Sequence, residues 1–471
     1  ANSFSSLSQA SVLTIGKRYK LIVDINLTSG QLRIQEGGAI LETYTTTGAN
    51  TATYYFIATA TNITFKTSVT PFNGSIDNVS VKEWVAADMD VTRATDATRV
   101  DENGLVENLG ANVPRIDYTG GGCPHILAEP QRTNLITYSE DLTNVFYQST
   151  GIETVTESAI ASPDGTSFGY TIVPTSATSS HYFEYNYSLV TVSVGVDVTY
   201  SIFIKRNGYN FIQIATSTGF AGKYQNFELT GDGVIGTGDV DGKTIEKIGD
   251  YYKISVTQIS TGTHPRFLLI PSPTALATRN ASFTGNGTDG VLGWGVQIEV
   301  GSYATSYILT SGSTVTRNQD IFTRDGIGSL INSTEGVLFA EIAALATINN
   351  AADAISIGDG TIANQIAMWY SNATNQFKVL IRQSGNKLFA ILTLTDAKAF
   401  IKVAISYKSG DMKVYINGVS VATSVSPFAF TAPLTLLDLG ATGLGNFNGK
   451  VKQLQVYDTA LTDDQLRQIT Q

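Results

Sequence analysis

The chain has few cysteines and few charged residues, and both facts exclude certain kinds of site and partner. Cys123 is the only cysteine among 471 residues, so an intrachain disulfide and a cysteine-based metal site are excluded. Charged residues make up 15% of the chain, and 40 Asp and Glu outnumber 30 Lys and Arg. The net charge of -10 argues against a nucleic-acid partner and against an anionic membrane surface, because both require clustered cations.

Long apolar runs and signature motifs of catalysis are also missing. No apolar stretch approaches the roughly 18 residues that a membrane-spanning helix needs, so we expect no membrane insertion. The sequence contains no P-loop, Rossmann fingerprint or HExxH motif. We therefore expect no enzyme activity and no required cofactor.

Glycine and tyrosine are plentiful instead, with 44 and 22 residues, which favours short strands joined by tight turns. Apolar and polar residues alternate in "KRYKLIVDINL", "DVTYSIFIKR" and "MKVYINGVSVAT", the period of half-buried strands. Even strand spacing predicts an all-β chain of tandem β-sandwich or jelly-roll modules. A T-x-x-Q capping box at Thr462 and Gln465 predicts a short C-terminal helix.

The alternation is interrupted in two places, which divides the chain into modules. We predict a first jelly roll over residues 1–85, an ordered connector over 86–134, a second jelly roll over 135–316 and a third sandwich over 317–471. The first block shows only four or five clear strands, fewer than a jelly roll usually has. We expect that residues upstream of Ala1, or a neighbouring subunit, complete it.

Several of these segments resemble known protein families. The connector, with "TRATDATRV", "PRIDY" and "EPQRTNL", resembles a stretch of bacteriophage and prophage virion proteins that precedes a carbohydrate-binding-like jelly roll, and "WGVQIEVGSYATSYILTSGSTVTRNQD" resembles that jelly roll. "GKRYKLIVDI" and "GSIDNVSVKEW" resemble the closing half of another such jelly roll, so the first block looks partial. "MKVYINGVSVAT" and "GKVKQLQVYDTALTDDQLRQI" resemble a concanavalin A-like, laminin-G-like sandwich.

The resemblance implies a non-enzymatic virion appendage, a fibre or surface protein of the phage particle, whose lectin-like domains adhere to host cell-surface glycan. It also implies other virion proteins as partners and a homo-oligomer, commonly a trimer. Two alternatives stay open. The chain is either a structural or decoration protein that binds no sugar, or the glycan-binding arm of a secreted bacterial enzyme that degrades polysaccharide.

The stretch "CPHILAEPQRTNLITYSEDL" raises the question of a thiol nucleophile, because Cys123 and His125 lie two residues apart and Glu129, Glu140 and Asp141 follow. A catalytic cysteine needs a base within hydrogen-bond reach and a third group that orients it. Pro124 enforces extended backbone at this point. We interpret the stretch as a strap between modules, with a small buried thiol and a hydrogen-bonded histidine.

Aromatic residues beside amides are candidates for sugar contacts, since rings stack on sugar C–H surfaces and amides bind hydroxyls. In "HYFEYNY", alternation places Tyr185 and Tyr187 on one face, which is either a glycan platform or sandwich core. In "MWYSN", Trp369, Tyr370 and Asn372 form a second candidate, and alternation turns one of its two rings to solvent. Trp84 and Trp294 are interpreted as packing residues.

Calcium is compatible with two isolated acids. Asp77 matches the position of an acid on the closing strand of related jelly rolls that helps bind structural calcium, although the acidic partner expected near the start of the domain is missing. Asp359 in "SIGDGT" is a similar candidate. The acids of "GDGVIGTGDVDG" lack EF-hand spacing and are interpreted as solvated turn residues.

Overall fold

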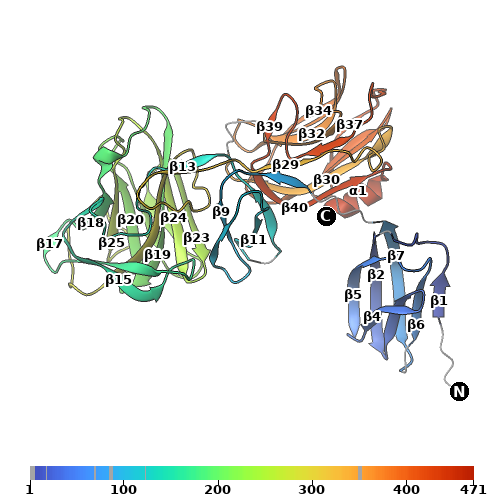
Figure 1. Ribbon diagram of the computed structural model, residues 1–471, viewed down its shortest axis with the longest axis horizontal. Helices are drawn as coiled ribbons and strands as arrows, with labels where there is room; N and C mark the ends of the chain where they lie inside the picture. The colour runs from blue at the N-terminus through green and yellow to red at the C-terminus, as the bar shows by residue number, and fades with distance from the viewer. Residues whose placement is uncertain (1–5, 17, 68–69, 84–88, 122, 348–352) are drawn as a thin grey trace. The chain divides into compact units, whose positions relative to one another are not determined.

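The computed structural model describes residues 6–16, 18–67, 70–83, 89–121, 123–347 and 353–471. The chain separates into two compact units, Ala1–Asp88 and Met89–Gln471. In the described ranges the regular structure is almost entirely β-strand, with one short α-helix at the C-terminus (Figure 1). This confirms the predicted all-β class.

The N-terminal unit is a sandwich of antiparallel sheets. One sheet has the order β1 (Ser6–Gln9), β6 (Ile63–Thr67), β3 (Leu32–Glu36) and β4 (Ala39–Tyr44). The other has the order β5 (Gly48–Ile57), β2 (Arg18–Ser29) and β7 (Asn73–Glu83).

The core of this unit follows from the period-two alternation of its strands. Leu21 and Val23 of β2 are buried against Ile34 of β3 and Phe65 of β6. Strands β1 and β4 add to those that alternation predicted, and most of their side chains are exposed. The described residues therefore supply more strands than expected, while the need for a completing segment stays a prediction.

The middle of the second unit is a further sandwich, called the central sandwich below. One sheet has the order β14 (Tyr147–Thr150), β18 (Tyr182–Tyr185), β25 (Phe267–Ser272), β20 (Phe211–Thr216), β21 (Tyr224–Glu228) and β22 (Val234–Gly238). The other has the order β15 (Ile152–Ala161), β16 (Phe168–Pro174), β27 (Gly290–Val300), β19 (Asp197–Asn207), β24 (Tyr251–Ile259) and β23 (Gly242–Ile248). The chain passes repeatedly between the two sheets, as in a jelly roll.

Short elements close the central sandwich. They are β17 (Thr178–Ser179), which pairs with β26 (Phe283–Thr284), the 3-10 helix η1 (Tyr187–Leu189), and β13 (Arg132–Asn134), which pairs with β28 (Val315–Arg317). The β13 and β28 pair brings together the segments that enter and leave the sandwich. Between the sheets, Ile202 and Ile254 pack with Ile214, Phe227 and Leu269.

The C-terminal sandwich has two larger sheets. One has the order β11 (Ile116–Asp117), β12 (His125–Ala128), β40 (Gly449–Tyr457), β30 (Glu335–Ala344), β35 (Ile401–Lys408), β36 (Met412–Ile416) and β37 (Val419–Ser424). The other has the order β34 (Asn386–Thr393), β33 (Gln376–Gln383), β32 (Asn364–Tyr370), β31 (Asp353–Gly358), β38 (Leu436–Asp438), β29 (Ile321–Arg324) and β8 (Asp90–Thr92), with β39 (Gly445–Asn446) beside β31. Helix α1 (Asp463–Thr470) begins at the predicted capping box, in which Thr462 and Gln465 satisfy each other's backbone N–H groups.

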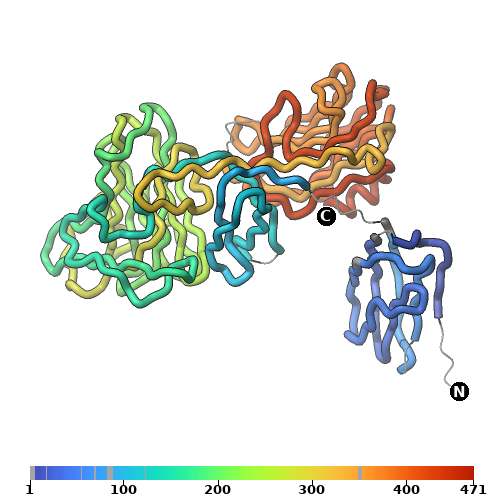
Figure 2. The backbone as a smooth tube through the Cα atoms, in the orientation of Figure 1, coloured from blue at the N-terminus to red at the C-terminus, as the bar shows by residue number. Residues whose placement is uncertain are grey.

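The connector is built into the C-terminal sandwich. Its strand β8 pairs with β29, and its strand β12 pairs with β40 (Figure 2). Between them, β9 (Ala97–Val100) and β10 (Val106–Leu109) form a hairpin. Sequence alternation did not predict these strands, because each is at most four residues long.

A buried ion network holds the connector against its neighbours. It consists of Arg93, Arg115, Glu129, Arg317 and Asp320, all at most 3% exposed. Arg93 bonds Asp320 at 2.8 Å, while Arg115 bonds Glu129 at 2.6 Å and also pairs with Asp320. Arg317 reaches Glu129 at 2.7 Å. The network joins the connector to the segment that leaves the central sandwich, and buried charges need such partners to persist.

Candidate functional site

Cys123 and His125 do not form a nucleophile and base. The thiol of Cys123 is exposed, which corrects the expectation of a small buried thiol, because the residue lies in the glycine-rich loop between β11 and β12. The imidazole of His125 is buried, with Nε2 3.5 Å from Asp117 Oδ1 and the ring beside Phe400. Burial and the charge of Lys450 lower the pKa of His125 to about 4, although Asp117 opposes this, so the ring is neutral at pH 7.

The predicted platform around Tyr185 is core. Tyr185 is 1% exposed between the two sheets of the central sandwich, where it stacks on Phe146 and donates its hydroxyl to Pro265 O. Tyr187 lies in η1 and is half-buried, with its ring 5.0 Å from the Arg266 guanidinium. This corrects the idea that Tyr185 and Tyr187 share an open face, because the strand ends at Tyr185 and alternation ends with it.

The predicted cluster around Trp369 is also largely buried. Tyr370 is 1% exposed, faces the core between the sheets and donates to Ile342 O at 3.3 Å. Trp369 points to the opposite face of β32, yet it is only 7% exposed, since Leu444 and Ala441 pack over it. Only Asn372 is exposed. Neither ring therefore faces solvent, which corrects the expectation that one of them does.

The other tryptophans follow the packing interpretation as far as they are described. Trp294 is 1% exposed and donates its indole N–H to Ser167 Oγ at 3.2 Å, which confirms its assignment as a packing residue. Trp84 lies outside the described residues.

Among the described residues, the calcium candidates are not gathered into a metal site: Asp77 lies opposite a single acid, Asp24 of β2. Asp77 is exposed and accepts the backbone N–H of Asn78. Asp359 accepts bonds from the Thr361 hydroxyl at 2.7 Å and the Asn364 amide at 2.6 Å, as a turn-stabilising carboxylate does. Within the described ranges, no group of three or more His, Cys, Asp or Glu side chains is gathered in a way that could hold a metal ion.

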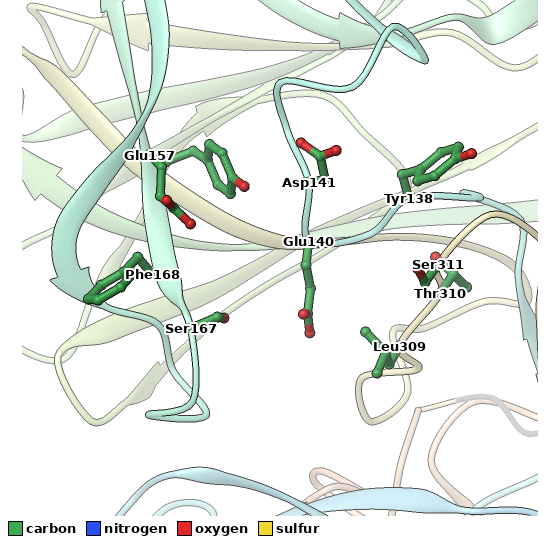
Figure 3. A pocket seen from close by; sticks show the side chains of 10 residues that line it. Tyr138, Glu140, Asp141, Glu157, Ser167, Phe168, Leu309, Thr310 and Ser311 are labelled. Atoms are coloured by element: carbon green, nitrogen blue, oxygen red, sulfur yellow. The ribbon is translucent and has the colours of Figure 1, made fainter.

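A cavity of about 240 Å³ at one end of the central sandwich combines carboxylates with aromatic rings (Figure 3). We call it the acidic pocket. Its lining residues come from the segment before β14, from β15 and β16 with the loop between them, and from the segment after β27. They are Tyr138, Glu140, Asp141, Glu157, Ser167, Phe168, Tyr170, Leu309, Thr310 and Ser311. In Figure 3, Glu140 lies between Phe168 on one side and Leu309 on the other.

Backbone pairing holds the walls of the acidic pocket in place. Tyr138 and Ser311 form a β-bridge, and the Ser139 N–H bonds Thr310 O at 3.2 Å. On the other wall, Glu157 of β15 pairs directly opposite Tyr170 of β16, so their side chains project from the same face. The pocket is therefore formed by segments with their own regular hydrogen bonding, which favours a fixed geometry.

The electrostatics of the acidic pocket are one-sided. Burial raises the pKa of Glu140 above its ordinary value, and repulsion from Asp164 adds to this, while a hydrogen bond from the Tyr307 hydroxyl at 3.1 Å opposes it. Burial also raises the pKa of Tyr170, and the charges of Asp141, Glu157 and Glu140 raise it further. Tyr170 thus keeps its proton at neutral pH and can donate a hydrogen bond.

The chemistry of these groups suits a polyhydroxylated ligand. Carboxylates accept hydrogen bonds from hydroxyls, and the rings of Phe168, Tyr138 and Tyr170 offer apolar faces. In the sequence, Glu140 and Asp141 indicate only acids of a strap between modules, and the pocket is not predicted. The signal in the sequence is weak, because the lining residues 138–141 and 309–311 meet only through tertiary pairing.

A second, smaller cavity of about 70 Å³ lies beside Gln213 and Phe283. Here the segment 273–283 covers the outer face of a central sheet, and the Gln213 amide donates to Ala277 O at 3.3 Å while accepting from the Asn280 N–H at 2.7 Å. The Gln213 amide is thus already bonded by the chain itself, although the buried Asn280 Oδ1 has no hydrogen-bond partner among the described residues. The acidic pocket is larger and carries more polar groups, so it is the better candidate.

Comparison with solved structures finds distant likenesses. Domain 4 of AbnA, an extracellular arabinanase from Geobacillus stearothermophilus solved with arabinotriose, is 19% identical, with 36% of this chain and 82% of that chain covered and a TM-score of 0.26. A protein from Bacteroides ovatus described as a carbohydrate-binding protein is 15% identical, with 59% and 80% covered and a TM-score of 0.23. A sialidase of Trypanosoma rangeli solved with the inhibitor DANA is 11% identical, with 84% and 74% covered and a TM-score of 0.24. At such TM-scores these likenesses carry no argument about the ligand of this chain.

Among curated proteins, none matches the chain. No helix in the described residues is long and apolar enough to cross a membrane. Residues 343–467, from the end of β30 into α1, match the concanavalin A-like lectin/glucanases superfamily in its laminin G-like form. The C-terminal sandwich of this chain is therefore a concanavalin A-like, laminin G-like domain.

Proposed function

We propose that this chain is a non-enzymatic glycan-binding protein and that the acidic pocket of the central sandwich is its sugar site. The observation that carries the proposal is the convergence of aromatic rings and carboxylates around one cavity of about 240 Å³. Neutral sugars are bound in this way, with rings against C–H faces and carboxylates on hydroxyls. The lectin-like architecture of the C-terminal domain is compatible with the same role.

Replacing the exposed ring of the pocket tests this proposal. Phe168 is 46% exposed, so Phe168→Ala removes a ring that solvent reaches, with little effect on the core. Phe389 in the C-terminal domain is also 46% exposed, so Phe389→Ala is a matched control. Both full-length variants and the parent chain are screened on a glycan array, and hits are titrated by saturation-transfer NMR.

We expect Phe168→Ala to weaken binding of any glycan hit about fivefold or more, because an aromatic contact contributes about 1 kcal/mol beyond area burial. Phe389→Ala should leave that affinity unchanged. If both variants bind as the parent does, the acidic pocket is not the sugar site. If the parent chain binds no glycan at all, the proposed function itself is wrong.

Glycoside hydrolysis is a second candidate, favoured by one observation. Glu140 has a raised pKa and lies with Asp141 and Glu157 around one cavity, and glycosidases pair a protonated carboxyl with an ionised one. We infer that the pocket only binds, and incubation of the full chain with bacterial surface polysaccharides tests this. Depolymerisation that Glu140→Gln abolishes and Glu153→Gln leaves intact would show an enzyme instead.

The biological setting we propose is a phage virion appendage, a fibre or surface protein on the particle that adheres to host glycan alongside other virion proteins and as a homo-oligomer, commonly a trimer. This part of the proposal is supported by the sequence resemblance of the connector alone. Antibody labelling of particles from the source, together with the mass of the full chain in solution, tests it. Absence from particles, with secretion beside a catalytic domain, would favour the polysaccharide-degrading arm. Presence on particles without glycan binding would favour the decoration role.

A further inference from the structure

Several buried carboxylates of the second unit have arginine counter-ions, whereas the buried carboxylate of Asp353 accepts a hydrogen bond from the Asn448 amide at 2.6 Å. Glu129 and Asp320 are each paired with arginines, Glu184 makes a two-pronged pair with Arg266, and Glu299 lies 3.6 Å from Arg132. In contrast, the residues that line the acidic pocket include no lysine, arginine or histidine. Within the described part of the chain, Glu140, Asp141 and Glu157 form no ion pair with a cation.

The three acids act on one place in the pocket. Each of them raises the pKa of Tyr170, so all three lie close enough to its hydroxyl for their charges to add. Glu140 accepts a hydrogen bond from the Tyr307 hydroxyl at 3.1 Å, and Asp141 accepts one from the Thr143 hydroxyl at 2.7 Å. The two side chains point in opposite directions along the wall of the pocket (Figure 3). A cavity with this charge and no internal counter-ion attracts a cation and repels uronic or sialic acids.

From these observations, and resting on the proposed function, we propose that the acidic pocket selects a sugar that carries a protonated amino group. The ammonium supplies the counter-ion that the pocket carboxylates lack. The hydroxyls of the sugar then bond the remaining polar groups of the pocket, and its C–H faces pack against the aromatic rings. Phe168, Tyr138 and Tyr170 suit an organic ammonium in particular, because aromatic faces attract such cations. A bare metal ion uses oxygen ligands only and leaves these rings without a role.

A series of β-1,4-linked hexasaccharides with one backbone tests the inference on the full chain. The probes are cellohexaose, which is neutral, the hexamer of N-acetylglucosamine, which is neutral and bulkier, and the hexamer of glucosamine, which carries ammonium groups. Isothermal titration calorimetry at low salt should give an affinity for the glucosamine hexamer about tenfold above that for cellohexaose, as a few partly exposed charge pairs supply together. The difference should shrink at 0.5 M NaCl, where screening is strong.

Matched variants separate a built site from general attraction to an acidic protein. Glu157 and Glu153 are both exposed and lie on the same strand, β15, but only Glu157 lines the pocket. Glu157→Gln should reduce the affinity for the glucosamine hexamer about threefold more than it reduces the affinity for cellohexaose. Glu153→Gln should change neither.

Three results would overturn the inference. Equal affinity for the three hexasaccharides would leave a neutral sugar site, so the proposed function would stand without the amine. If neither Phe168→Ala nor Glu157→Gln reduces the preference for the glucosamine hexamer, the preference reflects non-specific attraction to an acidic protein. Calcium chloride that binds at micromolar concentration and displaces the glucosamine hexamer would assign the pocket to a metal ion.

Discussion

Replacing Arg115 with methionine tests whether the buried ion network holds the connector in place. Arg115 bonds Glu129 at 2.6 Å, Ser306 Oγ at 2.8 Å and Thr98 O at 3.2 Å, and it pairs with Asp320. The substitution keeps an unbranched apolar side chain of similar length but removes every donor. Two buried carboxylates then lose their shared cation.

The expected loss follows from the partners that remain. Removing one partner of a buried ion pair costs about 3–5 kcal/mol, because a charge stays buried without compensation. After the change, Glu129 keeps Arg317 at 2.7 Å and Asp320 keeps Arg93 at 2.8 Å. We therefore expect the lower end, a decrease of about 3 kcal/mol in the free energy of unfolding.

Urea unfolding of the full chain, followed by tryptophan fluorescence, measures the effect, since Trp294 and Trp369 report on the two sandwiches that the connector joins. Arg467→Met is the control, because Arg467 pairs with Asp464 at the surface and such pairs contribute about 0–1 kcal/mol. If Arg115→Met shifts the transition no more than Arg467→Met does, the network is not a source of stability and the reasoning is wrong.

The pH dependence of unfolding gives an independent check. Burial alone would raise the pKa of Glu129, but Arg317 and Arg115 outweigh it and hold the pKa well below its usual range. A depressed carboxyl pKa contributes stability that is complete above the unfolded-state value of about 4.3 and is lost as the pH falls below it. The parent chain should therefore lose more stability between about pH 5 and pH 3 than Glu129→Gln does.

Three further predictions concern other parts of the chain. Burial raises the pKa of Asp353 to about 7 in the folded chain, so the stability of the folded chain falls as the pH rises from about 4 to 7. In thermal unfolding, Asp353→Asn should therefore be more stable than the parent at pH 8 but not at pH 4. Trp369→Ala should lower the free energy of unfolding measured in urea by about 3 kcal/mol, because it opens a cavity beside Leu444. An unchanged unfolding midpoint together with weaker cell attachment would instead show that Trp369 binds a ligand. In hydrogen exchange on the full chain, residues 19–23 and 79–81 should be less protected than the C-terminal sandwich, because a small unit buries less surface. Equal protection would show that the N-terminal unit closes by itself.

The features that local sequence encodes were predictable. Alternation located strands such as β2 and β19, and the pair Thr462 and Gln465 located the start of α1, because both signals act within a few residues. Alternation also predicted that Trp369 and Tyr370 point to opposite faces of their strand, but it did not reveal that both faces are covered. Trp369 points away from the core of its sandwich and is still buried, since a loop with Leu444 packs on it.

The acidic pocket was beyond prediction for a different reason. Tyr138 and Ser311 are far apart in the chain and meet through a single β-bridge, which no local pattern announces. The ion network is similar, because Arg115 belongs to the connector and Asp320 to the segment after the central sandwich, and nothing in the sequence links the two. Charged residues in a connector are usually solvated, and only the fold shows that these are not.

The same ion network limits how such a chain can be rearranged by recombination. Strands β8 and β12 belong by sequence to the connector but by pairing to the C-terminal sandwich, and Arg93 and Arg115 need Asp320 from beyond the central sandwich. A crossover between residues 134 and 316 would separate these partners unless the incoming segment supplied the same charges. Residues 89–471 should therefore be exchanged between related chains as one unit. The central sandwich is an insertion within this unit, and its loops, including those of the acidic pocket, can vary without breaking the ion network.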